Sequence, residues 1–235
     1  MKVAIMQPYL FPYIGYFQLI KAVDTFVIYD DVQYIKSGWI NRNRILVNDS
    51  SHLFSFSLKK SSSYTQINQR YFSNKFIYEK NKFFKLINSN YRKSPHYIEV
   101  MTMIEKTLDV DIENHSIAQI IGESLKIVCA YLDINTRFIA SSDIKKNVNL
   151  KGEERVIDIN KQLHADVYIN SIGGKELYSK ETFLTNGLQL YLLQPNHITY
   201  QQKDGVFVPR LSIIDVMMFN TRRDIKNMLQ EYELI

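Results

Sequence analysis

Short apolar runs alternate with longer stretches of helical periodicity at the start of this chain. Residues 3–6 and 26–29 are each four apolar residues in a row, which is typical of a strand buried on both faces of a parallel sheet. Between them, residues 15–22 carry Phe17, Leu19 and Ile20 at the spacing of the apolar side of a helix. A strand, a helix and a second strand in this order predict one crossover unit of a parallel sheet.

The middle of the chain is predicted to be helical, and strands and helices alternate again after it. In residues 116–132 the apolar positions fall on one stripe of a helix, at Ile117, Ile120, Ile121, Leu125 and Val128. The elements predicted after residue 40 are a hairpin at 44–47 and 52–58, helices at 75–90, 97–108, 116–132, 152–163 and 211–219, and strands at 137–140, 166–170 and 188–193.

This order of elements predicts a doubly wound, Rossmann-like parallel α/β sheet with a helical insertion. We expect residues 1–72 to form the N-terminal part of the α/β domain, 73–135 the insertion and 136–235 the C-terminal part. Ligands of open parallel sheets bind beyond the carboxyl ends of the strands. The loops that follow the predicted strands are therefore the places to look for chemistry.

The loop after the first predicted strand is rich in aromatic residues. It contains two prolines, which fix its path, and Gly15, which permits a close backbone approach. The helix that follows offers free N–H groups, which suit an anion. Its candidate binding residues are Gln7, Tyr9, Tyr13, Gly15 and Tyr16. The alternative is that these aromatic side chains only pack.

Two consecutive carboxylates, Asp30 and Asp31, end the second predicted strand. Such a pair can hold the hydroxyls of a sugar, act as a base or bind a divalent cation. No third ligand is evident nearby, so a metal site is not predicted. The alternative is that one of the two carboxylates caps a turn.

A polar segment follows at Asn41, Arg42, Asn43 and Arg44. Arginine is suited to bidentate recognition of phosphate or carboxylate. If the segment is a strand, the two asparagines face one side and the two arginines the other, so all four would not enter one site. The alternative is an exposed polar edge strand.

In the second half, Gly173, Gly174, Lys175 and Tyr178 follow the strand predicted at 166–170. Two glycines before a lysine suggest an anion cradle made of backbone N–H groups, although the spacing is not that of a Walker loop. Ser212 is the predicted N-cap of the last helix. Asp215, three residues later, either has a functional role or completes a reciprocal cap.

Composition narrows the class of protein. Cys129 is the only cysteine, so no intramolecular disulfide forms, and its place in an apolar helical stripe predicts a buried structural thiol. The five histidines lack metal-ligand spacing, and there is no G-x-S-x-G elbow. No apolar run is as long as a membrane span. We expect a cytoplasmic protein without integral membrane association.

The net charge of +5 and a pI near 9.0 suggest an anionic partner. Positive charge gathers at 59–60, 80–85 and 92–93, which either is a solvated surface or binds an anionic substrate or headgroup. No RGG tract, zinc finger or RNP motif is present, so specific nucleic-acid binding is not predicted. The expected partner is an anionic small molecule, and the oligomeric state does not follow from the sequence.

The motifs at 6–16, 30–32, 39–45, 172–178 and 211–215 together resemble those of the WbqC-like family. This family is found in bacterial gene clusters for O-antigens and related surface glycans. The resemblance implies an enzyme of lipopolysaccharide biosynthesis that transfers an acyl or aminoacyl group, such as glycyl, to the amino group of a nucleotide-linked sugar. Asp30, Asp31 and Arg42 would then be catalytic, and the other candidate side chains would line the substrate pocket.

The first half is also distantly similar to the nucleotidyltransferase and class I synthetase superfamily. There a His-Ile-Gly-His step stabilises ATP phosphates, whereas this chain has Tyr13-Ile14-Gly15-Tyr16. Tyrosine carries no positive charge near neutral pH. This similarity gives one alternative to group transfer, ATP-dependent activation of a carboxylate or nucleotidyl transfer. A second alternative, of a different class, is a non-catalytic module that binds glycans or partner proteins. No cofactor is assigned, although a nucleotide could enter as ATP or as part of the nucleotide-linked sugar.

Overall fold

A six-stranded sheet forms the centre of the computed structural model, which describes residues 1–203 and 205–235. The strand order is β5-β2-β1-β6-β7-β8, and only β8 runs antiparallel to its neighbour. The strands are β1 (Lys2–Met6), β2 (Thr25–Ile28), β5 (Arg137–Ala140), β6 (Val167–Ser171), β7 (Gln189–Pro195) and β8 (Tyr232–Leu234).

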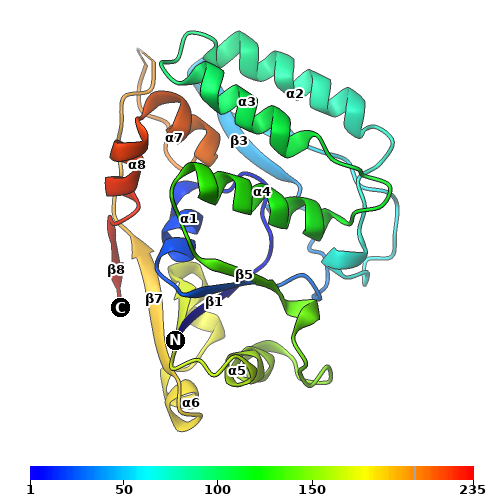
Figure 1. Ribbon diagram of the computed structural model, residues 1–235, viewed down its shortest axis with the longest axis vertical. Coiled ribbons are helices and arrows are strands. Elements are labelled where there is room, and N and C mark those ends of the chain that lie inside the picture. Colours follow the sequence, from blue (N-terminus) through cyan, green and yellow to red (C-terminus); the bar gives the residue numbers. More distant parts are fainter. Residues whose placement is uncertain (204) are drawn as a thin grey trace.

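Helices cover both faces of this sheet because its central strands are apolar on both sides. Val3 and Ile5 of β1 belong to the core on one face, and Ala4 belongs to the core on the other. On the first face lie α5 (Gly152–Gln162) and α6 (Lys180–Thr185), which are at the bottom of Figure 1. On the second lie α1 (Ile14–Lys21), α4 (Ile117–Tyr131), α7 (Ile213–Phe219) and α8 (Arg222–Met228).

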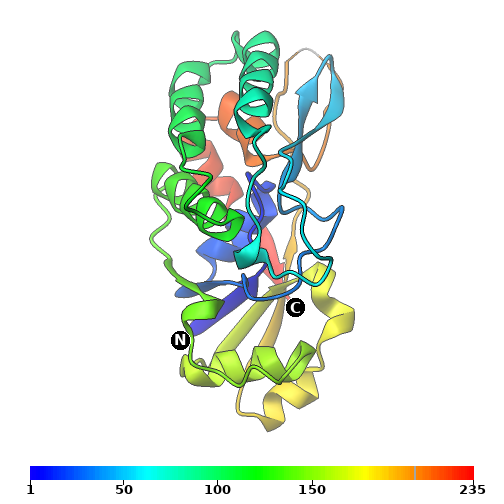
Figure 2. The same ribbon diagram turned by 90° about the vertical axis from the view of Figure 1, so that its right-hand side faces the viewer.

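The long connection from β2 to β5 contains a hairpin and three helices. The hairpin strands are β3 (Arg42–Val47) and β4 (Ser50–Ser55), and two further helices, α2 (Phe76–Tyr91) and α3 (Tyr97–Leu108), come before α4. Figure 2 shows the hairpin, α2 and α3 together at the end of the molecule away from α5 and α6. Their inner side belongs to the same core as α1 and α4. Phenylalanine rings of β4 and α2 are in contact there, and the ring centres of Phe54 and Phe83 lie 4.5 Å apart.

The chain winds in opposite senses from the middle of the sheet. The connection from β1 to β2 runs through α1, on one face of the sheet. The connection from β6 to β7 runs through a short helical turn (η3, Ile172–Leu177) and α6, on the other face. Such a reversal creates a crevice at the carboxyl ends of the two central strands. Here the ladder between β1 and β6 consists of only two residue pairs, the last being Val3 with Tyr168, so the two strands part before their carboxyl ends.

The predicted fold class is confirmed, and most element ends differ from the predicted ones by one to three residues. The α-helices α6 and α8, the edge strand β8 and the short 3-10 turns such as η3 were not predicted. Each is short, and a helix of two turns or a strand of three residues leaves little periodicity to detect. Within the described residues, no helix combines the length and the apolar character that a membrane crossing requires.

Candidate active site at the carboxyl edge of the sheet

The loop after β1 lies at the carboxyl edge of the sheet. The Tyr16 hydroxyl donates a hydrogen bond to the Gln7 carbonyl at 2.7 Å, and its ring packs 5.5 Å from that of Tyr9. Burial raises the pKa of Tyr9 and raises that of Tyr16 well above its ordinary value, so both stay protonated. Tyr13 is the exposed member of the set, and its ring lies so close to Gly15 that an added Cβ would come within 2.3 Å of it. Gly15 is therefore required for local packing.

The loop after β6 lies at the same edge of the sheet, because β6 is parallel to β1. Gly174 is buried, and a Cβ there would lie 2.3 Å from the Asn170 side-chain nitrogen, whereas Gly173 and Lys175 are exposed. Tyr178 closes the loop by packing edge-on against Tyr168 at 5.7 Å. The two glycines thus differ: one permits a close approach of side chain and backbone, and the other faces outward.

Asp31 lies at the centre of a buried ion cluster. Its Oδ2 atom is 2.7 Å from the Lys146 Nζ and 2.7 Å from an Arg155 guanidinium nitrogen, and the three side chains are only 11%, 2% and 12% exposed. Arg155 also donates to the Asp31 backbone carbonyl at 3.2 Å and stands over the Tyr29 ring at 5.6 Å. Lys146 also donates to the Ser141 backbone carbonyl. The cluster ties the β5–α5 connection and α5 to the end of β2.

Two features of this cluster favour an anionic ligand. Burial by itself would raise the pKa of the Asp31 carboxyl, but the Lys146 ammonium, the Ser141 hydroxyl and Arg155 outweigh it and hold the pKa below its ordinary value. The carboxylate is thus ionised and balances only one of the two cations. In addition, the Arg155 Nε atom and the Asp31 Oδ1 atom are both buried without a hydrogen-bond partner among the described residues, whereas buried guanidinium N–H groups and carboxylate oxygens normally have one.

Asp30 points to the other side of the sheet, since the cavity that it lines is bounded by α4, whereas Asp31 binds Arg155 of α5. Its two carboxylate oxygens accept hydrogen bonds from the Ser142 backbone N–H at 2.9 Å and hydroxyl at 2.6 Å. It also lines a cavity of about 540 Å³ at the carboxyl ends of β2 and β5. The ionisable side chains that line the rest of this cavity are Asp109, Asp111, His115, Glu123, Lys126 and Asp143. Carboxylates outnumber cations there, which suits a positively charged group.

This acidic cavity does not resemble a metal centre. Over residues 1–203 and 205–235, the structure brings no group of three or more His, Cys, Asp or Glu side chains into an arrangement that could hold a metal ion. Carboxylates that line a cavity can bind a cationic organic group or transfer protons.

The two asparagines of the β3 segment hold backbone groups. Asn43 is buried and donates to the Phe11 carbonyl at 2.9 Å, which fixes the loop after β1 against the hairpin. Asn41 donates to the Phe56 carbonyl and accepts from the Tyr34 hydroxyl, both at 2.7 Å. Asn43 thus supports the loop after β1, and Asn41 links Tyr34 to the residue that follows β4.

The two arginines of the same segment both stack on Trp39. Their guanidinium carbons lie 5.7 Å (Arg42) and 5.3 Å (Arg44) from the centre of the indole ring. Arg42 also donates to the Gly38 carbonyl at 2.7 Å and to the Ser37 carbonyl, so it holds its own loop. Arg44 is exposed on the outer side of β3, opposite Asn43, as strand geometry requires.

Ser212 is the N-cap of α7, as predicted, but Asp215 does not complete a reciprocal cap. Its carboxylate instead accepts hydrogen bonds from Tyr91 (2.7 Å), Tyr200 (2.6 Å) and Gln202 (2.7 Å). Burial raises the pKa of the Asp215 carboxyl, although the three donors act against it. The reciprocal-cap alternative is wrong, because both carboxylate oxygens accept hydrogen bonds from residues outside α7.

Sequence reasoning missed Lys146, Arg155 and His115. Lys146 lies in the connection after a predicted strand, a position that could have been searched for charged residues. Arg155 directly precedes Val156 on the buried flank of α5, where a cation needs a partner. His115 was considered only as a metal ligand, although histidine also transfers protons near neutral pH.

Comparison with known proteins shows the family of this chain. The model of the WbqC-like protein family matches residues 7–227, which include the loops after β1 and β6 and both carboxylates. The chain is also similar to the uncharacterised protein Rv1507c of Mycobacterium tuberculosis, with 26% identity over 220 residues, or 93% of each chain. No solved structure matches significantly. From the match over almost its whole length, we conclude that the chain belongs to the WbqC-like protein family.

Proposed function

We propose that this protein transfers an acyl or aminoacyl group, such as glycyl, to the amino group of a nucleotide-linked amino sugar in bacterial surface-polysaccharide synthesis. The observation that carries the proposal is that two consecutive carboxylates have different surroundings. Asp31 holds a partly uncompensated cationic cluster on one side of β2, and Asp30 lines an acidic cavity on the other. A substrate that carries both phosphates and an amine needs both kinds of surface.

In this proposal the amine of the sugar lies in the acidic cavity. An amine attacks a carbonyl carbon only after it has lost its extra proton, which the Asp30 carboxylate or the His115 imidazole accepts. The nitrogen–carbon bond then forms while the bond between the acyl carbon and the leaving group of an activated donor breaks. Asp30 is suited to this task because Ser142 fixes its carboxylate in one orientation.

Arg155 is proposed to bind the phosphate of the sugar nucleotide or the carboxylate of the donor. Its guanidinium is held in place by Asp31 and keeps one N–H group without a partner in the described part of the chain. Arg42, which already donates to two backbone carbonyls, is proposed to support that wall of the pocket. The exposed Tyr13 and Arg44 are proposed to meet the substrate at the rim.

The test is a transfer assay followed by mass spectrometry. Nucleotide-linked amino sugars are incubated with acyl and aminoacyl thioesters, or with amino acids and ATP, and the sugar nucleotide is examined for a new amide. Amide formation only with the preformed thioester supports direct transfer. Release of pyrophosphate from ATP before any amide forms would instead support the carboxylate-activating alternative. Absence of turnover with every pair, together with tight binding of a glycan, would refute the proposal.

A further inference from the structure

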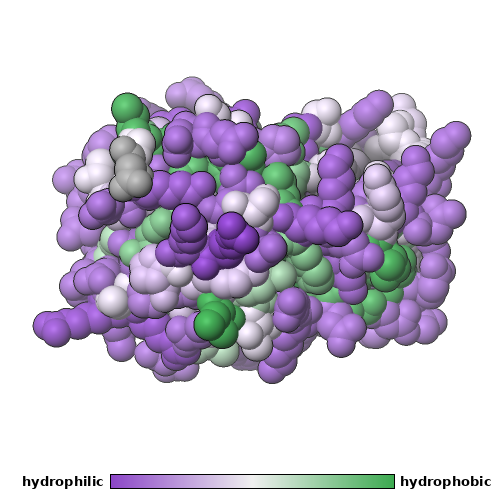
Figure 3. All heavy atoms as spheres, turned by 90° about the horizontal axis from the view of Figure 1, so that it is seen from above, coloured by the Kyte–Doolittle hydropathy of each residue, from purple (hydrophilic) through white to green (hydrophobic). Residues whose placement is uncertain are grey.

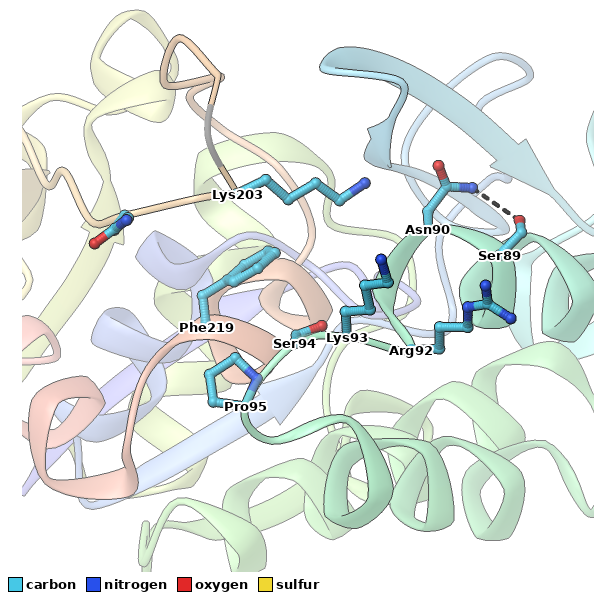
Figure 4. Close-up of a pocket in the computed structure, with 9 residues that line it drawn as sticks. Ser89, Asn90, Arg92, Lys93, Ser94, Pro95, Lys203 and Phe219 are labelled. Carbon is cyan, nitrogen blue, oxygen red and sulfur yellow. Dashed lines mark hydrogen bonds between the residues drawn. The ribbon is translucent and has the colours of Figure 1, made fainter.

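A second cavity lies apart from the carboxyl-edge site. It has a volume of about 620 Å³ and is bounded by the end of α2, the α2–α3 connection, residues 201–203 and the end of α7 (Figure 4). Pro95, which lines it, comes just before α3, and Asp109, which lines the acidic cavity, comes just after. The 12 residues of α3 therefore separate the two cavities by about 18 Å, at 1.5 Å per helical residue.

The charge of this cavity is opposite to that of the acidic cavity. Its ionisable lining consists of Arg92, Lys93 and Lys203. In Figure 4 the side chains of Lys93 and Lys203 extend from opposite walls into the same space. Among the residues that the structure describes, no carboxylate forms an ion pair with Arg92 or Lys93. Three cations around one concave space attract a multiply charged anion.

The remaining lining suits a ring system beside that anion. Phe219 lies at one side of the cavity (Figure 4), and its ring is fixed 5.8 Å from that of Tyr91. Asn90 and Gln201 also line the cavity, and the Asn90 amide is held in place by the Leu86 carbonyl and the Ser89 hydroxyl. An aromatic face gives stacking to a planar base.

The walls are held together from beneath by Asp215. Tyr91 follows Asn90, and Gln202 lies between Gln201 and Lys203; both Tyr91 and Gln202 donate to this buried carboxylate. Phe219 is the last residue of the helix that carries Asp215. One carboxylate thus ties all three walls, and the cavity is preorganised, which lowers the entropy that a ligand must lose on binding.

We propose that this basic cavity binds a nucleoside diphosphate, with the diphosphate between Arg92, Lys93 and Lys203 and the base against Phe219. No assignment of this cavity follows from family membership, and the inference does not depend on which reaction the carboxyl edge performs. The observations that favour a nucleotide over a simple anion are the volume of the cavity and its aromatic wall.

The test is isothermal titration calorimetry of the full chain with UDP, ADP and inorganic pyrophosphate. We expect one nucleoside diphosphate to bind at this cavity, in addition to any binding of its phosphates by Arg155 at the carboxyl edge. Arg92→Ala/Lys93→Ala should weaken it at least about tenfold, the loss expected from one charge-assisted hydrogen bond. Phe219→Leu should weaken nucleoside diphosphate binding and leave pyrophosphate binding unchanged.

The matched control is Lys82→Ala/Lys85→Ala. It removes the same two charges from the exposed side of α2, away from the cavity lining, and should change affinity less than about twofold. Equal weakening by both double variants would overturn the proposal, because the binding would then follow net charge alone. The proposal would also be overturned if neither UDP nor ADP bound, or if Phe219→Leu weakened the binding of nucleotide and of pyrophosphate equally.

Discussion

Replacing Asp31 by asparagine should destabilise the fold strongly, because two buried cations would lose their counter-ion. Lys146 and Arg155 are 2% and 12% exposed, so water can replace little of the lost interaction. Breaking a buried ion pair by removing one partner costs about 3–5 kcal/mol. We expect Asp31→Asn to lower the free energy of unfolding by that amount in urea titrations at pH 7, with an unchanged denaturant slope.

Glu113→Gln is the matched control. It also removes one carboxylate from an ion pair, but Lys59 and Glu113 are 44% and 64% exposed, and such a surface pair contributes about 0–1 kcal/mol. If Asp31→Asn also lost less than about 1 kcal/mol, the ion cluster would not have the energetic role inferred from its burial.

The pH dependence of the stability difference between wild type and Asp31→Asn gives an independent check. Because the pKa of the Asp31 carboxyl is lower in the folded protein than its ordinary value of 3.8, its contribution is present above that value and is lost as the pH falls through the folded-state pKa. The difference in stability between wild type and Asp31→Asn should therefore shrink below pH 3.8. A difference that stayed constant through that range would contradict the assignment.

Three further predictions concern stability and reactivity. Asp215→Ala leaves three buried donors without an acceptor and should lower the free energy of unfolding in urea titrations by more than about 3 kcal/mol. Asp215→Asn should lower it less. Because burial raises the pKa of the Asp215 carboxyl, the wild type should lose stability as the pH rises through that pKa, and Asp215→Asn should not show this loss. Gly174→Ala forces a Cβ to within 2.3 Å of Asn170 and should lower the melting temperature, whereas Gly173→Ala, whose Cβ has 3.8 Å of clearance, should not. Burial raises the pKa of the Cys129 thiol to about 12, so a thiol reagent should label it only after denaturation; rapid labelling of the native protein would show that the thiol is accessible.

The fold could be predicted because the apolar pattern is strongest where the sheet is most buried. Residues 3–6 have no polar member and lie in the central strand, which is covered on both faces. The amphipathic stripe of α4 and the N-cap at Ser212 are also local signals, and both were found in the structure. Cys129 is buried, as its place in that stripe predicted.

The partners of the candidate residues could not be predicted, because the contacts that select them are not local. Lys146 and Arg155 lie more than a hundred residues after Asp31 along the chain. A single sequence shows that a carboxylate pair follows β2, but not that one member faces a cationic cluster and the other an acidic cavity. That division depends on which connections pack against each face of the sheet.

A second reason why the site could not be predicted is that some polar side chains bind backbone groups and not a ligand. Asn43 belongs to a segment rich in binding-type side chains, yet its amide satisfies the carbonyls of the loop after β1. Buried backbone carbonyls need a donor, and an asparagine that supplies one has the same sequence pattern as an asparagine that meets a ligand. Sequence alone does not separate these two roles.

The central claim, that catalysis takes place at the carboxyl end of β2, is tested most directly by the kcat/KM of Asp30→Asn in the transfer assay. Asparagine keeps the shape of the side chain and can still bond Ser142, so the fold should be retained. We expect kcat/KM to fall at least about a hundredfold, the contribution typical of a positioned proton acceptor. Asp166→Asn, at the amino end of β6 and 78% exposed, should keep wild-type turnover. Wild-type turnover by Asp30→Asn would contradict the account.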